Sequence, residues 1–271
     1  MNLTAVLTGA TSGIGLETAR ALRQAGIRVI AVARDRAKGE AIAAELGVEV
    51  ELADLSVPSE TRAAAARIAD RVDAIDLVVN NAGGLFATRQ VTADGLERTF
   101  ATNHLGYFVL TTALLAKIER AAAPRVVIVS SEAHRSASIA WDDLQHGRWR
   151  GNGWPAYGQS KLMNLLFARE LARRAPRIEV HTVHPGFVAS GFGRNNGPVL
   201  RSMLNLASGL ARTPAQGADT VVWAATDPSL AGTTNRYWAD RSELVPSADA
   251  RDDAAAARLW EETEVVLRAT P

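Results

Sequence analysis

The sequence predicts an α/β fold, a single domain in which helices are layered on a parallel β-sheet. Short apolar runs alternate with helical segments of about 10 to 20 residues, which is the pattern of successive βαβ units. A glycine-rich turn, residues 8–15, joins the first apolar run to the first helical segment. A chain of 271 residues, 47% of them hydrophobic, can bury a substantial core without disulfides or metals.

Four short apolar runs, each followed by turn or helix-starting residues, are the strands expected in the first part of the chain: residues 3–7, 27–33, 48–52 and 77–79. The helical segments between them cover residues 16–25, 35–46 and 56–72. Gly26 suits the end of the first helix, because glycine readily adopts the left-handed conformation that closes helices. Asp35 can cap the second helix, and Pro58 suits the first turn of the third.

The alternation continues to the end of the chain. A long amphipathic segment covers residues 94–121, and residues 187–212, rich in Gly, Asn and Ser, are expected to form a loop with one short helix. The remaining strands are expected at residues 125–129, 179–183 and 235–239. The remaining helices are expected at residues 157–174, 213–225 and 252–267. No repeat or linker-like change of composition divides the chain, so residues 1–271 are predicted to be one domain.

The bulk composition excludes several classes of function. A net charge of +1 gives no electrostatic reason to expect nucleic acid or an anionic membrane as a partner. The absence of cysteine excludes disulfides, thiolate metal sites and a cysteine nucleophile, and no metal site is expected. Neither a signal peptide nor an apolar stretch of about 18 residues is visible, so a cytoplasmic protein is expected.

The glycine-rich turn predicts a nucleotide site. Gly9, Gly13 and Gly15 follow the first strand and open a helix, where missing side chains let a pyrophosphate approach the helix N-terminus. The spacing is G-x-x-x-G-x-G, which differs from the G-x-G-x-x-G dinucleotide fingerprint. A turn whose glycines serve only tight packing is the alternative.

The end of the second strand is the place where an adenosine ribose is recognised in such folds. An acidic residue there favours a free 2′-hydroxyl, and an arginine favours a 2′-phosphate. Asp35 already has a role as a helix cap, whereas Arg34 directly follows the apolar run. The sequence therefore favours NADP(H) over NAD(H), with a merely solvated Arg34 as the alternative.

Two further strand ends could contact the same cofactor. Asp54 can accept a hydrogen bond from an adenine amino group, and Leu55 can supply its main chain. Residues 80–83, two asparagines followed by two small residues, suit a cofactor wall lined by backbone. Simple turn roles are the alternative at both places.

The pair Tyr157 and Lys161 predicts acid–base chemistry. Four residues apart on a helix, they point to one face, where the ammonium group can lower the pKa of the phenol. Such a shift would let the tyrosine exchange a proton near neutral pH, because its unperturbed pKa is about 10. A surface pair without function is the alternative.

Together these motifs resemble the short-chain dehydrogenase/reductase family over essentially the whole chain. They stand in the family's order: Thr8-Gly9-x-x-x-Gly13-x-Gly15, Asn80-Asn81-Ala82-Gly83, Ser131, Tyr157-x-x-x-Lys161 and Pro185-Gly186. The resemblance implies a Rossmann-like three-layer sandwich with a seven-stranded parallel sheet. It also implies hydride transfer between a nicotinamide and an alcohol or carbonyl.

The resemblance implies a role for each matching residue. Tyr157 would be the general acid/base, and Lys161 would lower its pKa and hold the nicotinamide ribose. Ser131 would hydrogen-bond the substrate oxygen, and Asn103 would anchor a water that relays protons to Lys161. Structural roles for Asn103 and Ser131, as a helix-interior polar group and a loop cap, are the alternatives. The rest of the implied cofactor site is Thr11, Ser12, Ile14, Asn81, Ala82, Gly83, Pro185, Gly186 and Val188.

A narrower resemblance is to the retinol dehydrogenase and WW-domain oxidoreductase branch of the family. The segments that carry it are Arg34-Asp35-x-x-Lys38-Gly39, Thr92-Ala93-Asp94-Gly95-Leu96-Glu97, Asn103-His104-Leu105-Gly106, Ser130-Ser131-x-Ala133-His134 and Arg258-Leu259-Trp260-Glu261. That branch is mostly NADP-preferring and handles retinoids or other lipophilic carbonyls. No membrane anchor or WW domain is visible in this sequence.

The substrate side is expected to be an insertion and a loop. Ser131 and Tyr157 are 26 residues apart, about twice the family's usual gap. The stretch 132–155, with 187–212, is predicted to cap a mostly apolar pocket. Its candidate lining residues are His134, Trp141, Trp149, Trp154, Phe187 and Phe192. Packing of the tryptophans against the body is the alternative, and the glycines of the loop suit a mobile lid.

The sequence thus predicts an NADP(H)-preferring oxidoreductase that interconverts a carbonyl and an alcohol on a small lipophilic substrate. A nucleotide-binding or regulatory protein without turnover, an imine reductase and an epimerase are the alternatives. Family members often pair through helices that correspond to residues 95–121 and 157–174, so a homo-oligomer is a further expectation.

Overall fold

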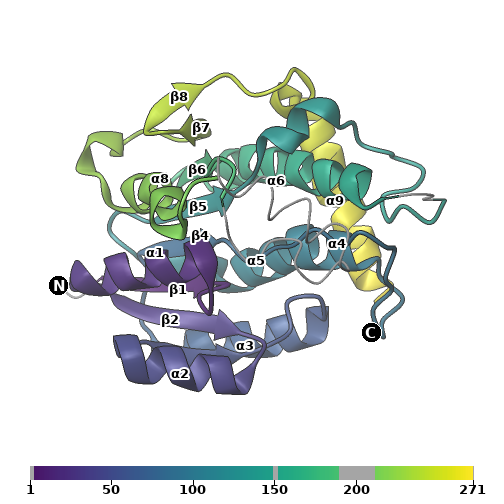
Figure 1. Cartoon of the computed structure of the whole chain (residues 1–271). Coiled ribbons are helices and arrows are strands. Elements are labelled where there is room, and N and C mark those ends of the chain that lie inside the picture. Colours follow the sequence, from purple (N-terminus) through teal and green to yellow (C-terminus); the bar gives the residue numbers. More distant parts are fainter. Residues whose placement is uncertain (1–2, 149–151, 189–210, 271) are drawn as a thin grey trace.

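The computed structural model describes residues 3–148, 152–188 and 211–270. Within them, eight strands form one sheet in the order β3-β2-β1-β4-β5-β6-β7-β8 (Figure 1). The strands are β1 (Thr4–Thr8), β2 (Arg28–Ala33), β3 (Glu49–Leu52), β4 (Leu77–Asn80), β5 (Arg125–Val129), β6 (Glu179–Val183), β7 (Arg236–Ala239) and β8 (Ser242–Leu244). Strands β1 to β7 are parallel, and β8 runs antiparallel to β7.

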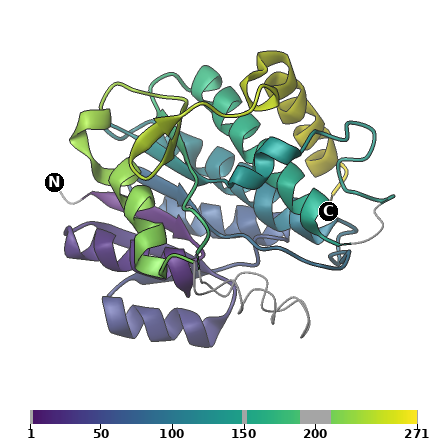
Figure 2. The same cartoon turned by 45° about the horizontal axis from the view of Figure 1, so that its top comes forward.

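Helices cover both faces of the sheet, which confirms the predicted three-layer α/β sandwich (Figures 1 and 2). One face is covered by α1 (Gly13–Gln24), α2 (Arg36–Leu46) and α8 (Pro214–Thr226). The other face is covered by α3 (Pro58–Arg71), α5 (Gly106–Ile118) and α6 (Trp154–Arg174), with α9 (Asp253–Arg268) packed on α6. Short helical turns complete the description: α4 (Arg98–Phe100), η1 (Ala101–Leu105), η2 (Glu132–Ser136), η4 (Pro228–Leu230) and η5 (Asp249–Arg251).

The central strands are mostly apolar because both of their faces are buried. In β1, Ala5 and Leu7 belong to the core under α1, whereas Val6 belongs to the core on the opposite face. Parallel sheets that helices cover on both sides need this pattern rather than an alternation of polar and apolar residues. Helix α2 begins as expected, since the Asp35 side chain accepts a hydrogen bond from the N of Lys38 at 3.1 Å.

The sheet has eight strands where seven were expected. The additional strand β8 is joined to β7 by Asp240 and Arg241, whose φ angles are 51° and 55°. Two consecutive residues with positive φ are the signature of a tight hairpin turn, which normally carries asparagine or glycine. Here each of the two side chains forms an ion pair, Asp240 with Arg212 and Arg241 with Asp219. The usual sequence signal of the hairpin is therefore missing.

The amphipathic segment 94–121 is not one regular helix. It contains α4, the π-helical turn η1 and then α5. Glu97 caps the start, where its carboxylate accepts hydrogen bonds of 2.8 Å from the N of Thr99 and the N of Phe100. Asn103 lies in the π-turn, a type of irregularity that is frequent at functional sites.

The C-terminal helix α9 lies alongside α6 on the side away from the sheet (Figure 2). Trp260 of α9 packs on Phe108 of α5 and Phe167 of α6, with ring centroids 4.7 Å and 5.8 Å away. Two copies that paired through these surfaces of α5 and α6 would first have to displace α9. A homo-oligomer stays a prediction.

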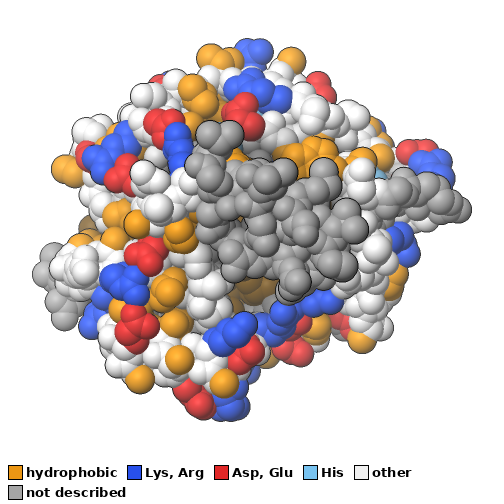
Figure 3. Space-filling view, viewed as in Figure 1, with side chains coloured by type: hydrophobic (Ala, Val, Ile, Leu, Met, Phe, Trp, Pro, Cys, Tyr) orange, Lys and Arg blue, Asp and Glu red, His pale blue; other side chains and the backbone are white. Residues whose placement is uncertain are grey.

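Charges of both signs are interspersed on the face drawn in Figure 3. None of the described helices is long and apolar enough to cross a membrane. Among the described residues, no group of three or more His, Asp or Glu side chains is arranged to hold a metal ion.

Candidate active site

The residues predicted for the site follow the carboxyl ends of six strands, which meet at one edge of the sheet. In the order of the sheet from β3 to β6 they are Asp54 and Leu55, Arg34, residues 9–15, residues 81–83, Ser131 and residues 185–188. The chain proceeds from β1 to β2 and β3 in one direction and from β4 onward in the other, so the order reverses between β1 and β4. Ligands of open parallel sheets bind outside the strand ends at such a reversal.

The turn after β1 leaves no room for side chains. Gly9 has a φ of 72°, and a Cβ on Gly15 would lie 2.1 Å from the O of Gly9. Thr8, whose role the sequence did not reveal, accepts hydrogen bonds of 2.9 Å at its Oγ1 from the N of Asn81 and the N of Ala82. These contacts lock the turn against the 81–83 segment, so tight packing accounts for part of the glycine pattern.

The same turn also fits a dinucleotide. Ser12 stands before the first residue of α1 but makes no side-chain hydrogen bond to the first helical turn. The Ser12 side chain therefore does not occupy the N–H groups of Gly13, Ile14 and Gly15, and a ligand could accept hydrogen bonds from them. A helix N-terminus with available N–H groups suits a pyrophosphate, which these residues would hold.

Arg34 and Asp54 come together at the ends of β2 and β3. The Nη1 of Arg34 lies 3.6 Å from the Oδ2 of Asp54, and the arginine side chain is 59% exposed. Asp54 also accepts hydrogen bonds from the N and the Oγ of Ser56, at 2.9 Å and 2.7 Å, so its expected turn role is present. Leu55 packs against Gly106, where a Cβ would lie 2.9 Å from the leucine O.

Ser131 and Tyr157 are brought together at the end of β5. The Ser131 hydroxyl lies near the Tyr157 phenol, and Tyr157 is 7% exposed. Burial raises the pKa of Tyr157 to about 12, although the Ser131 side chain opposes the rise. This direction is opposite to the one expected from the sequence, because loss of water around the phenol outweighs the effect of the Ser131 side chain. A lowering by Lys161 in the reacting complex stays a prediction.

Lys161 is buried beside Tyr157. Its Nζ lies 5.5 Å from the centroid of the tyrosine ring and donates a hydrogen bond of 3.1 Å to the O of Val129. Burial lowers the pKa of Lys161 to about 8, because the charged form is poorly solvated there. Ser130, the first serine of the pair, donates to the O of Lys161 at 2.8 Å and so supports the helix rather than the reaction.

Asn103 is anchored on two sides. Its Oδ1 accepts a hydrogen bond from the N of Gly84, and its Nδ2 donates to the O of Gly84, each at 2.9 Å. The same Nδ2 donates to the Oγ of Ser160 at 3.0 Å, and Ser160 in turn donates to the O of Tyr157 at 2.7 Å. These contacts give Asn103 the structural role that was its alternative, and a role in holding water stays a prediction. Ser160 was missed, because nothing in its local sequence shows this long-range contact.

His134 fixes the backbone around Ser131. Its Nδ1 lies 2.7 Å from the O of Ser131, and its Nε2 lies 3.2 Å from the N of Ser247. Because a backbone N–H can only donate, Nε2 must accept and the proton must sit on Nδ1, where it is donated to Ser131. Burial lowers the pKa of His134, which agrees with a neutral ring. Both ring nitrogens are thus engaged in positioning Ser131.

The segment after β6 closes the edge of the site. Gly186 has a φ of 81°, and the Arg212 side chain occupies the space that a Cβ would need, with Cδ and Nε at 2.8 Å. Pro185 is buried, and Val188 lies against Ile14 and Gly217 near the start of α1. The 185–188 segment therefore reaches the dinucleotide turn, as its predicted cofactor role requires.

The predicted cap is described only in part. Trp149, Phe192 and most of the 187–212 loop, including its glycines, lie outside the described residues. Trp141 packs against the core, with the Arg258 guanidinium 4.3 Å above its ring, so packing accounts for it. Trp154 and Phe187 are instead 52% and 49% exposed. The extent of the cap stays a prediction.

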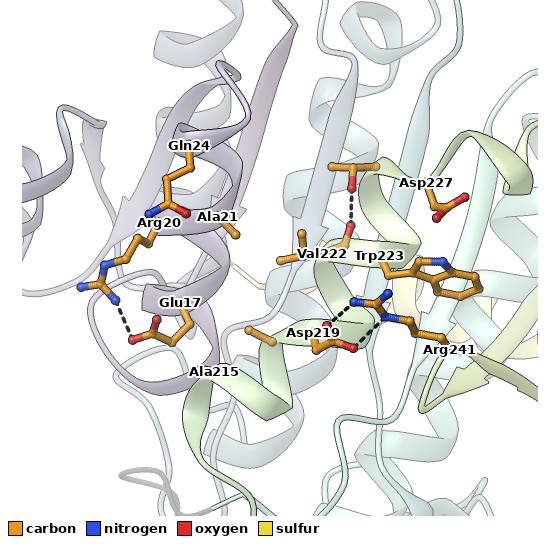
Figure 4. Close-up of a pocket in the computed structure, with 12 residues that line it drawn as sticks. Glu17, Arg20, Ala21, Gln24, Ala215, Asp219, Val222, Trp223, Asp227 and Arg241 are labelled. Atoms are coloured by element: carbon orange, nitrogen blue, oxygen red, sulfur yellow. Dashed lines mark hydrogen bonds and ion pairs between the residues drawn. The ribbon is translucent and has the colours of Figure 1, made fainter.

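A surface pocket of about 390 Å³ lies away from this edge, between α1 and α8 (Figure 4). Four of its charged side chains form two pairs, Arg20 with Glu17 at 2.6 Å and the Nε of Arg241 with Asp219 at 2.8 Å, and Asp227 accepts a hydrogen bond of 2.8 Å from the N of Ser229. A charged ligand would have to break these pairs, so the pocket offers no alternative active site.

Comparisons with known proteins point in the same direction as the geometry. A family model described as "short chain dehydrogenase" matches residues 3–198. Retinol dehydrogenase 14 from Mus musculus is 35% identical over 288 residues, which cover 97% of this chain and 85% of that protein. The "Putative daunorubicin C-13 ketoreductase DnrU" from Streptomyces sp. (strain C5) is 38% identical over 264 residues, which cover 95% of this chain and 90% of that protein. A crystal structure of an uncharacterized protein from Mycobacterium Paratuberculosis aligns with a TM-score of 0.80 and 35% identity, covering 98% and 93% of the two chains.

Proposed function

The chain belongs to the short-chain dehydrogenase/reductase family, oxidoreductases that act on CH–OH donors, and from that premise we propose an NADP(H)-preferring enzyme for a small lipophilic carbonyl compound and its alcohol. The observation that carries the proposal is the position of the Tyr157 ring, whose centroid lies 5.5 Å from the Nζ of the buried Lys161. The Ser131 hydroxyl lies near the Tyr157 phenol, so a proton donor, a second polar group and an ammonium group would act together at the strand ends.

Proton transfer follows from this arrangement. With a pKa of about 12, Tyr157 is protonated at neutral pH, the state in which it can donate to a carbonyl oxygen. A substrate oxygen within hydrogen-bond distance of both hydroxyls would be oriented by Ser131 and receive its proton from Tyr157. Lys161 places positive charge where the phenolate would form and so would stabilise it.

The cofactor preference is supported by Arg34. The nicotinamide cofactor, when bound, supplies or accepts the hydride. Asp35 is occupied as the N-cap of α2, whereas the guanidinium of Arg34 is more than half exposed at the end of β2. An arginine there can bind a 2′-phosphate with paired N–H donors. The ion pair with Asp54 holds the guanidinium near the strand ends.

The lipophilic substrate is supported by the exposed aromatic side chains near the site. Trp154 is the first residue of α6, and Phe187 follows the end of β6. About half of the surface of each side chain is exposed. The names of two relatives, a retinol dehydrogenase and a daunorubicin ketoreductase, refer to alcohols or ketones. The imine and epimerase alternatives have no observation in their favour, and a cytoplasmic location stays a prediction.

A substrate panel tests the proposal. Purified protein is mixed with NADPH and a series of aldehydes and ketones, and the loss of absorbance of the reduced nicotinamide is followed. We expect turnover of lipophilic carbonyls with NADPH and much weaker turnover with NADH. Protein that binds NADPH tightly but reduces nothing in the series would contradict the catalytic part, and equal rates with both cofactors would contradict the preference.

A further inference from the structure

Trp154 lies beside the proposed proton donor and is open to solvent. It is the first residue of α6, one turn before Tyr157, and the two ring centroids are 5.6 Å apart with their planes tilted by 36°. Tyr157 is 7% exposed, whereas Trp154 is 52% exposed. An open indole therefore directly adjoins the reacting group.

The exposure of Trp154 differs from that of the other described tryptophans. Trp223 and Trp238 pack on each other at 5.0 Å, Trp260 packs on Phe108 and Phe167, and Trp141 lies under Arg258. Those side chains are buried or half-buried in contacts that stabilise the fold. A large apolar side chain left half open at a site suggests a binding contact rather than a packing contact.

The backbone around Trp154 is held firmly. A Cβ on Gly153 would lie 1.7 Å from the O of Phe86, so the start of α6 is in direct backbone contact with the segment after β4. The N of Trp154 donates to the Oδ1 of Asn152 at 3.2 Å, and the N of Tyr157 donates to the O of Gly153 at 3.0 Å. The backbone that carries Trp154 and Tyr157 is therefore held by contacts within α6 and with the segment after β4.

Phe86 is the other aromatic side chain at this position, but one of its faces is occupied. The guanidinium of Arg98 lies 5.0 Å from the centroid of the Phe86 ring. Trp154 has no cation over its ring among the described residues. Trp154, 52% exposed, is thus the more open of the two rings, since Phe86 is half-buried.

We propose that Trp154 is a specificity-determining residue that stacks on a flat ring system next to the reacting carbon, so that aryl and polycyclic ketones and aldehydes are preferred over saturated ones. The inference rests on the proposed function, because it needs the substrate oxygen at the Tyr157 hydroxyl. With the oxygen there, a planar group joined to the carbonyl carbon reaches the neighbouring indole, whose centroid is 5.6 Å from the tyrosine ring. Offset or edge-on ring pairs at 4.5–7 Å strengthen binding by about 3- to 10-fold beyond the area they bury.

Two methyl ketones with the same carbon skeleton test this preference, 2-acetylnaphthalene and its saturated counterpart 2-acetyldecahydronaphthalene. Their KM and kcat values are measured with NADPH for the wild type, Trp154→Ala and Trp154→Phe. We expect Trp154→Ala to raise the KM for the naphthyl ketone by about 10-fold and that for the decahydronaphthyl ketone by no more than about 2-fold. Trp154→Phe should keep most of the selectivity. Val265→Ala, an equally exposed apolar position on α9, should change neither value.

A binding measurement separates this inference from the proposed function. The Kd of 2-acetylnaphthalene, with NADP⁺ present, is measured by calorimetry for Tyr157→Phe and for Tyr157→Phe combined with Trp154→Ala. Weaker binding of the ketone by the double variant than by Tyr157→Phe supports stacking on Trp154. If the wild type binds both ketones but reduces neither, that result contradicts the proposed function and leaves the stacking inference standing. Equal Kd values, or a KM change of the same size for both ketones, would overturn the role of Trp154.

Discussion

The side-chain amide of Asn103 donates a hydrogen bond of 3.0 Å to the hydroxyl of Ser160. This contact joins the π-turn that precedes α5 to the helix that carries Tyr157 and Lys161. Ser160 passes the connection on, because its hydroxyl donates to the O of Tyr157. The position of Tyr157, the proposed proton donor, therefore depends on Ser160, which is not among the proposed catalytic residues.

Ser160→Ala should disturb this connection without touching substrate. The substitution leaves one N–H of the buried Asn103 amide without its acceptor, at a cost of about 1–3 kcal/mol in the free energy of unfolding. We expect a lower urea midpoint and a lower kcat, with the Kd for NADPH within about 2-fold of the wild type. Ser136→Ala, which removes an exposed hydroxyl on η2, is the matched control. Unchanged stability and unchanged kcat in Ser160→Ala would show that the contact is dispensable.

Arg34→Ala should remove most of the preference for NADPH. An arginine–phosphate hydrogen bond contributes about 1.5–3 kcal/mol, which corresponds to roughly 10- to 100-fold in Kd. The Kd values of NADPH and NADH are measured by fluorescence titration for both proteins. Arg120→Ala removes the same charge at an exposed position at the far end of α5 and should leave the ratio unchanged. If Arg34→Ala keeps the wild-type ratio of the Kd values for NADH and NADPH, another group recognises the 2′-phosphate.

His134→Ala should lower kcat by releasing the backbone of Ser131. The neutral ring donates to the O of Ser131 and accepts from the N of Ser247, and a displaced reacting group can cost roughly 10- to 100-fold in rate. An amide has both a donor and an acceptor, so His134→Asn should recover part of the loss. Steady-state kinetics on all three proteins provide the comparison. Equal rates for His134→Ala and the wild type would contradict the positioning role.

Buried histidines should make the protein sensitive to acid. Burial lowers the pKa of His104 to about 3 and that of His181 to about 4, from 6.5. Below pH 6.5 the unfolded chain binds protons at these positions that the folded chain does not, so the free energy of unfolding falls as the pH falls toward 3. Urea midpoints between pH 7.5 and 4 should therefore decrease, and less steeply in His104→Phe. A midpoint that stays constant over this range would contradict the assignment.

The sequence predicted the fold class because both the strands and the turns have local signals. Strand β5 is a run of apolar residues buried on both faces, and Asp35 caps its helix as its position suggested. The same holds for the site, where motif residues follow strand ends whose meeting point is dictated by the parallel sheet. Ser131 follows such a strand end, but its place beside Tyr157 of α6 came from the resemblance to the family.

The features that the sequence did not predict depend on tertiary contacts. The turn at Asp240 and Arg241 lacks the glycine that marks a hairpin, because ion pairs with other elements hold it. Thr8 and Ser160 act through hydrogen bonds to distant residues, which no local pattern shows. Burial raises the pKa of Tyr157 in this structure, and the burial of a phenol cannot be judged from its spacing to a lysine.

Turnover by Tyr157→Phe tests the central claim most directly. The variant keeps the ring and its contact with Trp154 but loses the hydroxyl that lies near Ser131. With NADPH and the best substrate of the panel, we predict that kcat falls by roughly 100- to 10,000-fold while the Kd for NADPH stays nearly unchanged. Turnover by Tyr157→Phe at a rate near that of the wild type would contradict the assignment of Tyr157 as the proton donor.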